Sequence, residues 1–213
     1  MTEETGLPAF YPVMLDLAGL PCLVVGGGLV AVRKARSLLA SGATVTVLTP
    51  ALSNEMESLV PSLHAVERRT YEAGDASGYR LIVSATGDPS VDGAVFEDAE
   101  SHGVWVNSSD DLAHSSFILP AVFRDGDVTV SVSTGGLSPA LAVWLRDRIA
   151  ARNGSGLGTL ARILGEARDQ LRQRGLAVSS VDWQGLLDGP LPTLVEAGAL
   201  ERAAEIVNDA AGL

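Results

Sequence analysis

Three consecutive glycines, Gly26, Gly27 and Gly28, limit what this chain can fold into more than any other feature. Residues 22–25 before them are typical of a short buried strand, residues 30–41 of a helix, and residues 44–48 of a second strand. Gly26, Gly28 and Ala31 form the pattern G-x-G-x-x-A across this strand–turn–helix unit. The first glycine permits a tight turn, the second lets the backbone approach a pyrophosphate, and the small third residue keeps the helix close to the sheet. The unit predicts a dinucleotide-binding turn, and the alternative is a tight turn without a ligand.

The start of the predicted helix is the expected phosphate site, because the first N–H groups of a helix lack intrahelical acceptors. The residues that we expect to contact the cofactor there are Gly26, Gly28, Leu29, Val30 and Ala31. The second strand ends at Thr49, Pro50 and Ala51. This end holds neither an acid for a ribose 2′-hydroxyl nor an arginine for a 2′-phosphate, so the motif leaves NAD and NADP open.

The segments after this unit continue the alternation of strands and helices. Residues 53–62 and 90–101 are predicted helices, and residues 65–71, 81–85 and 105–107 are predicted strands. Such alternation predicts a parallel sheet with right-handed crossovers. Thr86 follows the strand 81–85 and is expected to form part of the cofactor wall, because ligands bind outside the carboxyl ends of parallel strands. Residues 10–17 are expected to form an extended, hairpin-like lead-in to the sheet.

From residue 116 the pattern changes. Two alternating runs, 117–124 and 128–133, are joined by Asp125, Gly126 and Asp127, which predicts a β-hairpin. Helices are predicted over 139–151, 159–174 and 200–211, with NGSGLG at 153–158 as a linker.

Composition and charge exclude several classes of protein. A net charge of -11 over 213 residues argues against general nucleic-acid binding, which needs a basic face. No apolar run approaches the length of a membrane span, and the acidic N-terminus lacks the basic region of a secretory signal. Cys22 is the single cysteine, so an internal disulfide is excluded, and no metal site is expected. We expect a globular cytoplasmic protein.

Four stretches together resemble the N-terminal region of siroheme synthase, a region also found alone as precorrin-2 dehydrogenase with or without sirohydrochlorin ferrochelatase activity. They are FYPVMLDLAGLPCLVVGGGLVAVRKA, LIVSATGDPSV, VNSSDDLAHSSFILPAVFRDGDVTVSVSTGGLSPALAVWLRDRI and GLGTLARILGEARDQLRQR. The joint pattern of VGGG-x-VA-x-RKA, SFI-x-P and S-[ST]-GG-x-SP-x-LA is far more specific than the glycine turn alone. The match ends near Arg174.

The resemblance implies an α/β fold in three parts. These are an NAD-binding Rossmann domain (residues 1–113), a small α+β dimerisation region (114–152) and a helical C-terminal domain (153–213). It also implies an intertwined homodimer that oxidises precorrin-2 to sirohydrochlorin with NAD. Some members also insert Fe(II) into sirohydrochlorin, and this sequence leaves that second activity open.

Asp110 is the catalytic residue that the resemblance implies. Removing a hydride from the macrocycle also releases a proton, which a carboxylate near the nicotinamide would accept. Asp111 and His114 remain alternative proton acceptors, and His114 also a transient iron ligand or substrate contact. Turn capping is the structural alternative for Asp110, because Ser108–Asp111 has the composition of a turn.

The expected tetrapyrrole contacts follow the hairpin. They are Ser133, Thr134, Gly135, Gly136 and Arg146. Thr134 stands where some relatives carry a serine that is phosphorylated, so modification at this position stays open; a plain glycine turn is the alternative for the loop. Residues 144–174 hold seven arginines against three carboxylates, and arginine suits a substrate with many carboxylates. The alternative for these arginines is a solvated helix surface.

Two other functions compete with the dehydrogenase. One is a regulatory NAD-sensing module, which the arginine-rich helices and the SFI-x-P hairpin disfavour. The other is a chelatase with a vestigial cofactor site, which the intact Gly26, Gly28 and Ala31 disfavour.

Overall fold

The computed structural model describes residues 10–109, 111–153 and 156–213. It divides into two compact units, Met1–Leu119 and Pro120–Leu213, each with its own core. The three-part division that the resemblance implies stays a prediction.

The first unit is built on a parallel sheet. Its strands are β1 (Pro21–Val25), β2 (Thr44–Leu48), β3 (Ala65–Glu67), β4 (Leu81–Ser84) and β5 (Trp105–Ser108). Every pairing is parallel, in the order β3-β2-β1-β4-β5. The predicted α/β parallel sheet is therefore confirmed. Strands β2 and β3 lie on one side of β1, and β4 and β5 lie on the other, so the strand order reverses between β1 and β4. A ligand is expected in the crevice at this point.

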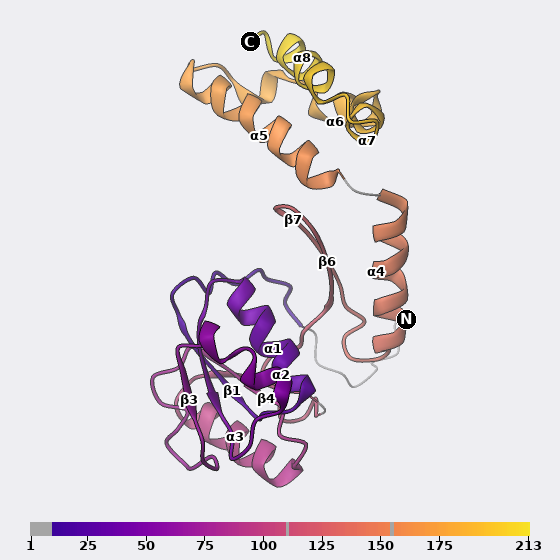
Figure 1. Cartoon of the computed structure of the whole chain (residues 1–213). Helices are drawn as coiled ribbons and strands as arrows, with labels where there is room; N and C mark the ends of the chain where they lie inside the picture. The colour runs from indigo at the N-terminus through magenta and orange to yellow at the C-terminus, as the bar shows by residue number, and fades with distance from the viewer. Residues whose placement is uncertain (1–9, 110, 154–155) are drawn as a thin grey trace. The chain divides into compact units, whose positions relative to one another are not determined.

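Helices cover both faces of this sheet (Figure 1). Helix α1 (Leu29–Ala40) and the short α2 (Asn54–Glu57) pack on one face, and α3 (Pro89–Ser101) packs on the other. Successive strand residues point to opposite faces, so Val24 joins the core under α1 while Leu23 joins the core under α3. The glycine turn between β1 and α1 lies at the carboxyl end of the sheet.

Three predicted segments of the first unit differ from the structure. The helix expected over 53–62 ends at Glu57 and continues as a separate 3₁₀ turn, Val60–Ser62, because Pro61 lacks the N–H that an α-helix needs. The strand expected over 65–71 ends at Glu67, where Arg69 turns to form a bidentate pair with Asp75 at 2.6 and 2.8 Å. The lead-in at 10–17 forms no strand and therefore no hairpin, because both edges of β1 are already paired with β2 and β4.

The second unit begins with the predicted hairpin. Strands β6 (Ala121–Asp125) and β7 (Val128–Val132) pair antiparallel, and Gly126 in the turn has a φ of 54°. Helix α4 (Pro139–Asn153) packs against both strands. The helical part follows, with α5 (Leu157–Gln173), a 3₁₀ turn η2 (Val178–Ser180), α6 (Trp183–Asp188), α7 (Leu191–Glu196) and α8 (Leu200–Ala211). Helices α5, α7 and α8 share a buried apolar core.

Asp125 fastens the hairpin to the start of α5. Its carboxylate accepts the N–H groups of Gly156 at 2.7 Å and Gly158 at 3.3 Å. These bonds hold the pKa of Asp125 below its usual range. A carboxylate at the first turn stabilises a helix, which explains why α5 begins at Leu157, inside the segment expected to be a linker.

No helix in the described residues is long and apolar enough to cross a membrane. Nor do the described residues hold a group of three or more potential metal ligands. Cys22 lies in β1 and is fully buried, and this burial raises the pKa of its thiol to about 11.

Candidate dinucleotide-binding site

Gly26 and Gly27 lie where the backbone leaves no room for a side chain. Gly26 has a φ of 122°, and a Cβ there would stand 2.3 Å from the carbonyl oxygen of Ala85. A Cβ on Gly27 would stand 2.0 Å from the carbonyl oxygen of Ala51. The turn after β1 is thus packed between the segments that follow β2 and β4. The motif predicts the role of Gly26 but gives no sign of the tight contact at Gly27, which depends on a residue far along the chain.

Gly28 has a different environment. No atom lies within 4 Å of the position that its Cβ would take, and the residue is exposed at the N-cap of α1. The N-cap makes no side-chain hydrogen bond, and the first turn of α1 holds no acid. The N–H groups of Leu29, Val30 and Ala31 lack an intrahelical acceptor. This open, uncapped helix start fits a pyrophosphate, because it combines free space with N–H donors and the positive end of the helix dipole.

The end of β2 is fastened to the glycine turn. The hydroxyl of Thr49 donates to the carbonyl oxygen of Ala51 at 2.9 Å, and the N–H of Ser53 donates to the carbonyl oxygen of Gly27 at 3.0 Å. Because the Thr49 side chain is buried and already bonded, it fixes the shape of this segment. The predicted ribose contacts of Thr49, Pro50 and Ala51 stay a prediction.

The end of β4 is held by a buried carboxylate that the motif does not reveal. Asp92, in the first turn of α3, accepts the hydroxyls of Ser84 at 2.5 Å and Thr86 at 2.7 Å with one oxygen, Oδ1. Asp92 is only 7% exposed. The bonds fix the loop after β4 against α3, so Thr86 is held in a defined position at the cofactor crevice. Its contact with the cofactor stays a prediction. The signal for Asp92 in the sequence is an acid in the first turn of a helix.

The end of β5 gathers unpaired polar atoms. The amide nitrogen of Asn107 donates to the carbonyl oxygen of Phe117 at 3.0 Å. In the described part of the chain, Asn107 Oδ1, Ser108 Oγ and Ser109 Oγ are buried without a hydrogen-bond partner. Each such atom costs about 1–3 kcal/mol, and native proteins seldom keep one without a reason. The three residues directly precede Asp110, which lies outside the described residues, so its catalytic role stays a prediction.

His114 lies beside α3. Its Nδ1 is 2.7 Å from Asp111 Oδ2, and this bond from His114 is the main cause that lowers the pKa of Asp111. The His114 ring packs edge-on against Phe96 with ring centres 5.4 Å apart. The pair is well formed, and its part in proton transfer or substrate binding stays a prediction.

The predicted substrate loop is a compact turn before α4. Ser133 Oγ accepts the N–H of Gly135 at 3.1 Å, and Thr134 exchanges two hydrogen bonds of 3.0 Å with the backbone of Ser138. Gly135 and Gly136 both have positive φ, at 63° and 89°. Local bonds therefore account for the loop conformation, and substrate contact by these residues stays a prediction.

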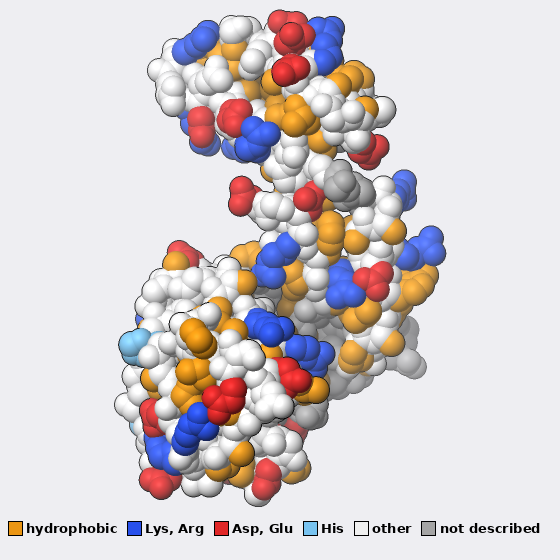
Figure 2. Space-filling model, viewed as in Figure 1, with side chains coloured by type: hydrophobic (Ala, Val, Ile, Leu, Met, Phe, Trp, Pro, Cys, Tyr) orange, Lys and Arg blue, Asp and Glu red, His pale blue; other side chains and the backbone are white. Residues whose placement is uncertain are grey.

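The arginines of residues 144–174 are partly neutralised by local acids. Arg146 bonds to Asp147 at 2.6 Å, Arg162 to Glu166 at 3.0 Å and Arg172 to Asp169 at 3.2 Å. Figure 2 shows basic and acidic side chains interspersed over the helical part on the visible face. The substrate contact predicted for Arg146 stays a prediction, and the paired arginines suit a solvated surface.

Two family models match this chain. The family model described as "Putative NAD(P)-binding" matches residues 13–121, and the model "Sirohaem biosynthesis protein central" matches residues 125–152. Siroheme synthase of Methylococcus capsulatus is 40% identical over 208 residues, which cover 95% of this chain and 43% of that protein. Siroheme synthase of Chromobacterium violaceum is 39% identical over 193 residues, covering 89% of this chain and 41% of that protein.

The chain thus spans less than half the length of these relatives. A solved structure of SirC, precorrin-2 dehydrogenase, matches with a TM-score of 0.75 at 25% identity, and the match covers 94% of this chain and 100% of that one. The glycine turn, the sheet order and the hairpin with α4 fall within the matched regions. The chain therefore belongs to the siroheme synthase N-terminal family, with an NAD(P)-binding first unit.

Proposed function

We propose that this chain is an NAD-dependent dehydrogenase that oxidises precorrin-2 to sirohydrochlorin. The observation that carries the proposal is the open, uncapped start of α1 at Gly28, in a chain that aligns over its length with a solved precorrin-2 dehydrogenase. A regulatory NAD-sensing module is disfavoured, because the sirohaem central model covers the hairpin and α4.

Different residues along the carboxyl edge of the sheet bind the cofactor and hold the walls of its crevice. NAD, when bound, supplies the hydride acceptor. The N–H groups of Leu29, Val30 and Ala31 hold the pyrophosphate, and Gly28 leaves the space that it needs. The bonds from Ser84 and Thr86 to Asp92 keep the wall after β4 rigid.

Asp110 is assigned the proton transfer. Oxidation of the macrocycle removes one hydride and one proton, and the carboxylate of Asp110 accepts the proton on an oxygen atom. In the sequence, the residue comes two positions after the end of β5 and directly after Asn107, Ser108 and Ser109, whose side chains hold buried polar atoms. A strand end beside the crevice is where a catalytic group is expected.

The test follows the conversion of precorrin-2 by absorbance under anaerobic conditions with added NAD. The wild-type chain is expected to form sirohydrochlorin. Asp110→Ala should lose at least about 100-fold in rate while its NAD affinity stays unchanged, because general acid–base catalysis contributes about 10²–10⁴-fold. Asp111→Ala tests the neighbouring carboxylate, which is the alternative proton acceptor, and should keep its turnover. If Asp110→Ala turns over precorrin-2 at the wild-type rate, Asp110 is not a catalytic residue. If the wild-type chain binds NAD but does not oxidise precorrin-2, the proposed dehydrogenase activity is refuted.

Fe(II) is the proposed second substrate, because metal insertion also releases protons from pyrrole nitrogens and would use the same carboxylate. The assay supplies sirohydrochlorin with Fe(II) or Co(II) and omits NAD. Metal insertion by the wild-type chain that is lost in Asp110→Ala supports a shared site. No insertion by the wild-type chain restricts the enzyme to dehydrogenation.

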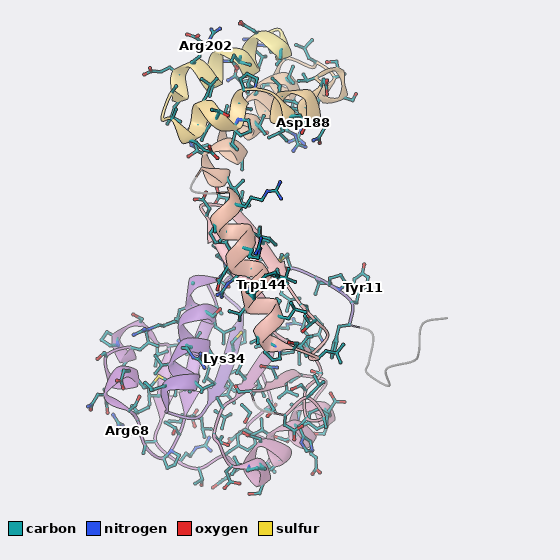
Figure 3. All side chains as sticks on the ribbon, turned by 90° about the vertical axis from the view of Figure 1, so that its right-hand side faces the viewer. Tyr11, Lys34, Arg68, Trp144, Asp188 and Arg202 are labelled. Carbon is teal, nitrogen blue, oxygen red and sulfur yellow. The ribbon has the colours of Figure 1, made fainter. Side chains whose placement is uncertain are left out.

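A homodimer is the proposed assembly, in the cytoplasm. Helix α4 and the loop before it expose Leu137, Leu141, Val143 and Trp144, whose exposed fractions are between 42% and 67%. Figure 3 labels Trp144 on this helix. Exposed apolar side chains gathered on one element are typical of a protein interface. Light scattering after gel filtration should give twice the chain mass, and Trp144→Glu should shift it toward the monomer.

A further inference from the structure

The helical part of the second unit contains an open pocket of about 530 Å³. Its lining comes from three elements: Leu164 and Arg168 on α5, Val178 and Ser179 on η2, and Trp183 on α6. Pockets of about 300–1,000 Å³ are the usual size for small-molecule sites. Of these residues, only Arg168 belongs to the arginine cluster of residues 144–174 described in the sequence.

The apolar walls of the pocket are preformed. Leu164 and Arg168 are four residues apart on α5 and therefore lie on the same face of the helix. The indole nitrogen of Trp183 donates to the carbonyl oxygen of Val178 at 2.9 Å, which joins α6 to η2. Because this bond uses the only polar atom of the indole, the rest of the ring presents an apolar surface.

Arg168 is the charged residue in the apolar lining of the pocket. Along α5, Arg162 is paired with Glu166 and Arg172 with Asp169, whereas Arg168 has no acidic partner among the residues that the structure describes. Asp182, next to Trp183, is committed to the N-cap of α6 through the N–H of Gly185 at 2.9 Å. A guanidinium beside apolar walls favours a ligand that is both apolar and anionic.

We propose that this pocket takes one carboxylate-bearing edge of the tetrapyrrole, an inference that rests on the proposed function. The edge of the macrocycle packs against Leu164, Val178 and Trp183, and one of its carboxylates pairs with Arg168. The helical part of the chain thereby contributes to substrate affinity without contributing to cofactor binding.

The experiment measures the equilibrium affinity of the full chain for sirohydrochlorin, followed by the absorbance of the tetrapyrrole, without NAD. Arg168→Gln should raise Kd about two- to fivefold, as expected for the loss of an exposed ion pair. The matched control is Arg172→Gln on the same helix, because Arg172 is already tied to Asp169 and should leave Kd unchanged. Ser179→Phe fills the pocket from η2 and should weaken binding while retaining wild-type stability.

Added salt should weaken binding more in the wild-type chain than in Arg168→Gln, because only the wild-type chain has the exposed charge pair. NAD affinity should be equal in all four proteins. Wild-type Kd values in both Arg168→Gln and Ser179→Phe overturn the proposal. A change in oligomer mass with unchanged Kd also overturns it, since the pocket is then covered by another copy.

The same preparations are tested for oxidation of precorrin-2. If the wild-type chain oxidises precorrin-2 but the variants bind sirohydrochlorin with unaltered Kd values, only the proposed role of the pocket is refuted. A wild-type chain that neither binds sirohydrochlorin nor oxidises precorrin-2 refutes the proposed function and the pocket with it.

Discussion

Replacing Gly27 and Gly28 separately by alanine should separate folding from cofactor binding. A Cβ on Gly27 would stand 2.0 Å from the carbonyl oxygen of Ala51 and 2.9 Å from the hydroxyl oxygen of Thr49. Close carbon–oxygen contacts in proteins are about 3.3–3.6 Å, so the backbone must move by more than about 1 Å. That movement also disturbs the bond from Ser53 to Gly27 and the bond from Thr49 to Ala51. Overpacking costs about 1–3 kcal/mol and each hydrogen bond about 1 kcal/mol, so Gly27→Ala should lose about 3–5 kcal/mol.

Gly28→Ala should be close to neutral for folding. Gly28 has φ -84° and ψ -177°, which any residue adopts, and its Cβ position is open. Loss of a glycine N-cap costs roughly 0.5–1 kcal/mol, and alanine recovers about 0.4–1 kcal/mol by restricting the unfolded chain. The new methyl group, however, occupies the space in front of α1 where we propose that the pyrophosphate binds, so NAD affinity should fall at least about tenfold, or about 1.4 kcal/mol.

The assay combines urea unfolding, followed by circular dichroism, with calorimetric titration of NAD. Gly28→Ala should match the wild-type midpoint and lose NAD affinity, whereas Gly27→Ala should unfold at much lower urea. Wild-type stability of Gly27→Ala would show that the turn is not packed against Ala51. Undiminished NAD affinity of Gly28→Ala would place the pyrophosphate elsewhere.

Other perturbations test separate contacts. Asp92→Ala should destabilise the chain by about 1–3 kcal/mol in urea unfolding, because the buried hydroxyl of Ser84 loses its acceptor; an unchanged midpoint would contradict this. Asp98→Asn should make stability depend less on pH in the acid range. Burial raises the pKa of Asp98, but the hydrogen bonds from the Tyr71 hydroxyl and from backbone N–H groups lower it by more, so the net pKa is below its usual value. Such a carboxyl stabilises the fold above its unfolded pKa of about 3.9 and loses this contribution as the pH falls through its lower folded pKa. If the stability of Asp98→Asn falls with pH as steeply as that of the wild type, this role of Asp98 is refuted. Asp125→Ala should speed amide hydrogen exchange at Gly156 and Gly158, measured by NMR, while the exchange in β1 stays unchanged. Gly28→Asp should abolish NAD binding in calorimetry, through both size and negative charge.

Local patterns predict most of the fold. The parallel sheet follows from apolar strands alternating with helices, and the hairpin follows from Asp125 and Gly126 between two alternating runs. The single helix predicted at 53–62 is wrong, because Pro61 divides the segment into a short α-helix and a 3₁₀ turn.

Several contacts that fix the cofactor crevice and the hairpin join residues from different elements, and a single sequence does not show them. Gly27 is constrained by Ala51, which lies beyond the whole of α1 and β2. Asp92 binds Ser84 across the turn from β4 into α3, and Asp125 caps a helix that starts more than thirty residues later. Residue type alone marks these positions as a glycine in a turn, an acid in a helix and an acid in a hairpin. Only the tertiary arrangement gives them partners.

The reactivity of the single buried cysteine can report how often the nucleotide-binding unit opens. Cys22 lies in β1 between β2 and β4, fully buried, with its thiol pKa raised to about 11. The reactive thiolate is therefore scarce at neutral pH and shielded from reagents in the native state. Cys22 lies in the core beneath α1 together with Val24, so labelling by a thiol-specific dye must wait for α1 to move off the sheet or for the unit to unfold. The labelling rate therefore measures how often the nucleotide-binding unit opens. A bound dinucleotide that stabilises the folded sheet would slow the labelling, which gives a ligand-screening assay that needs neither precorrin-2 nor an anaerobic chamber.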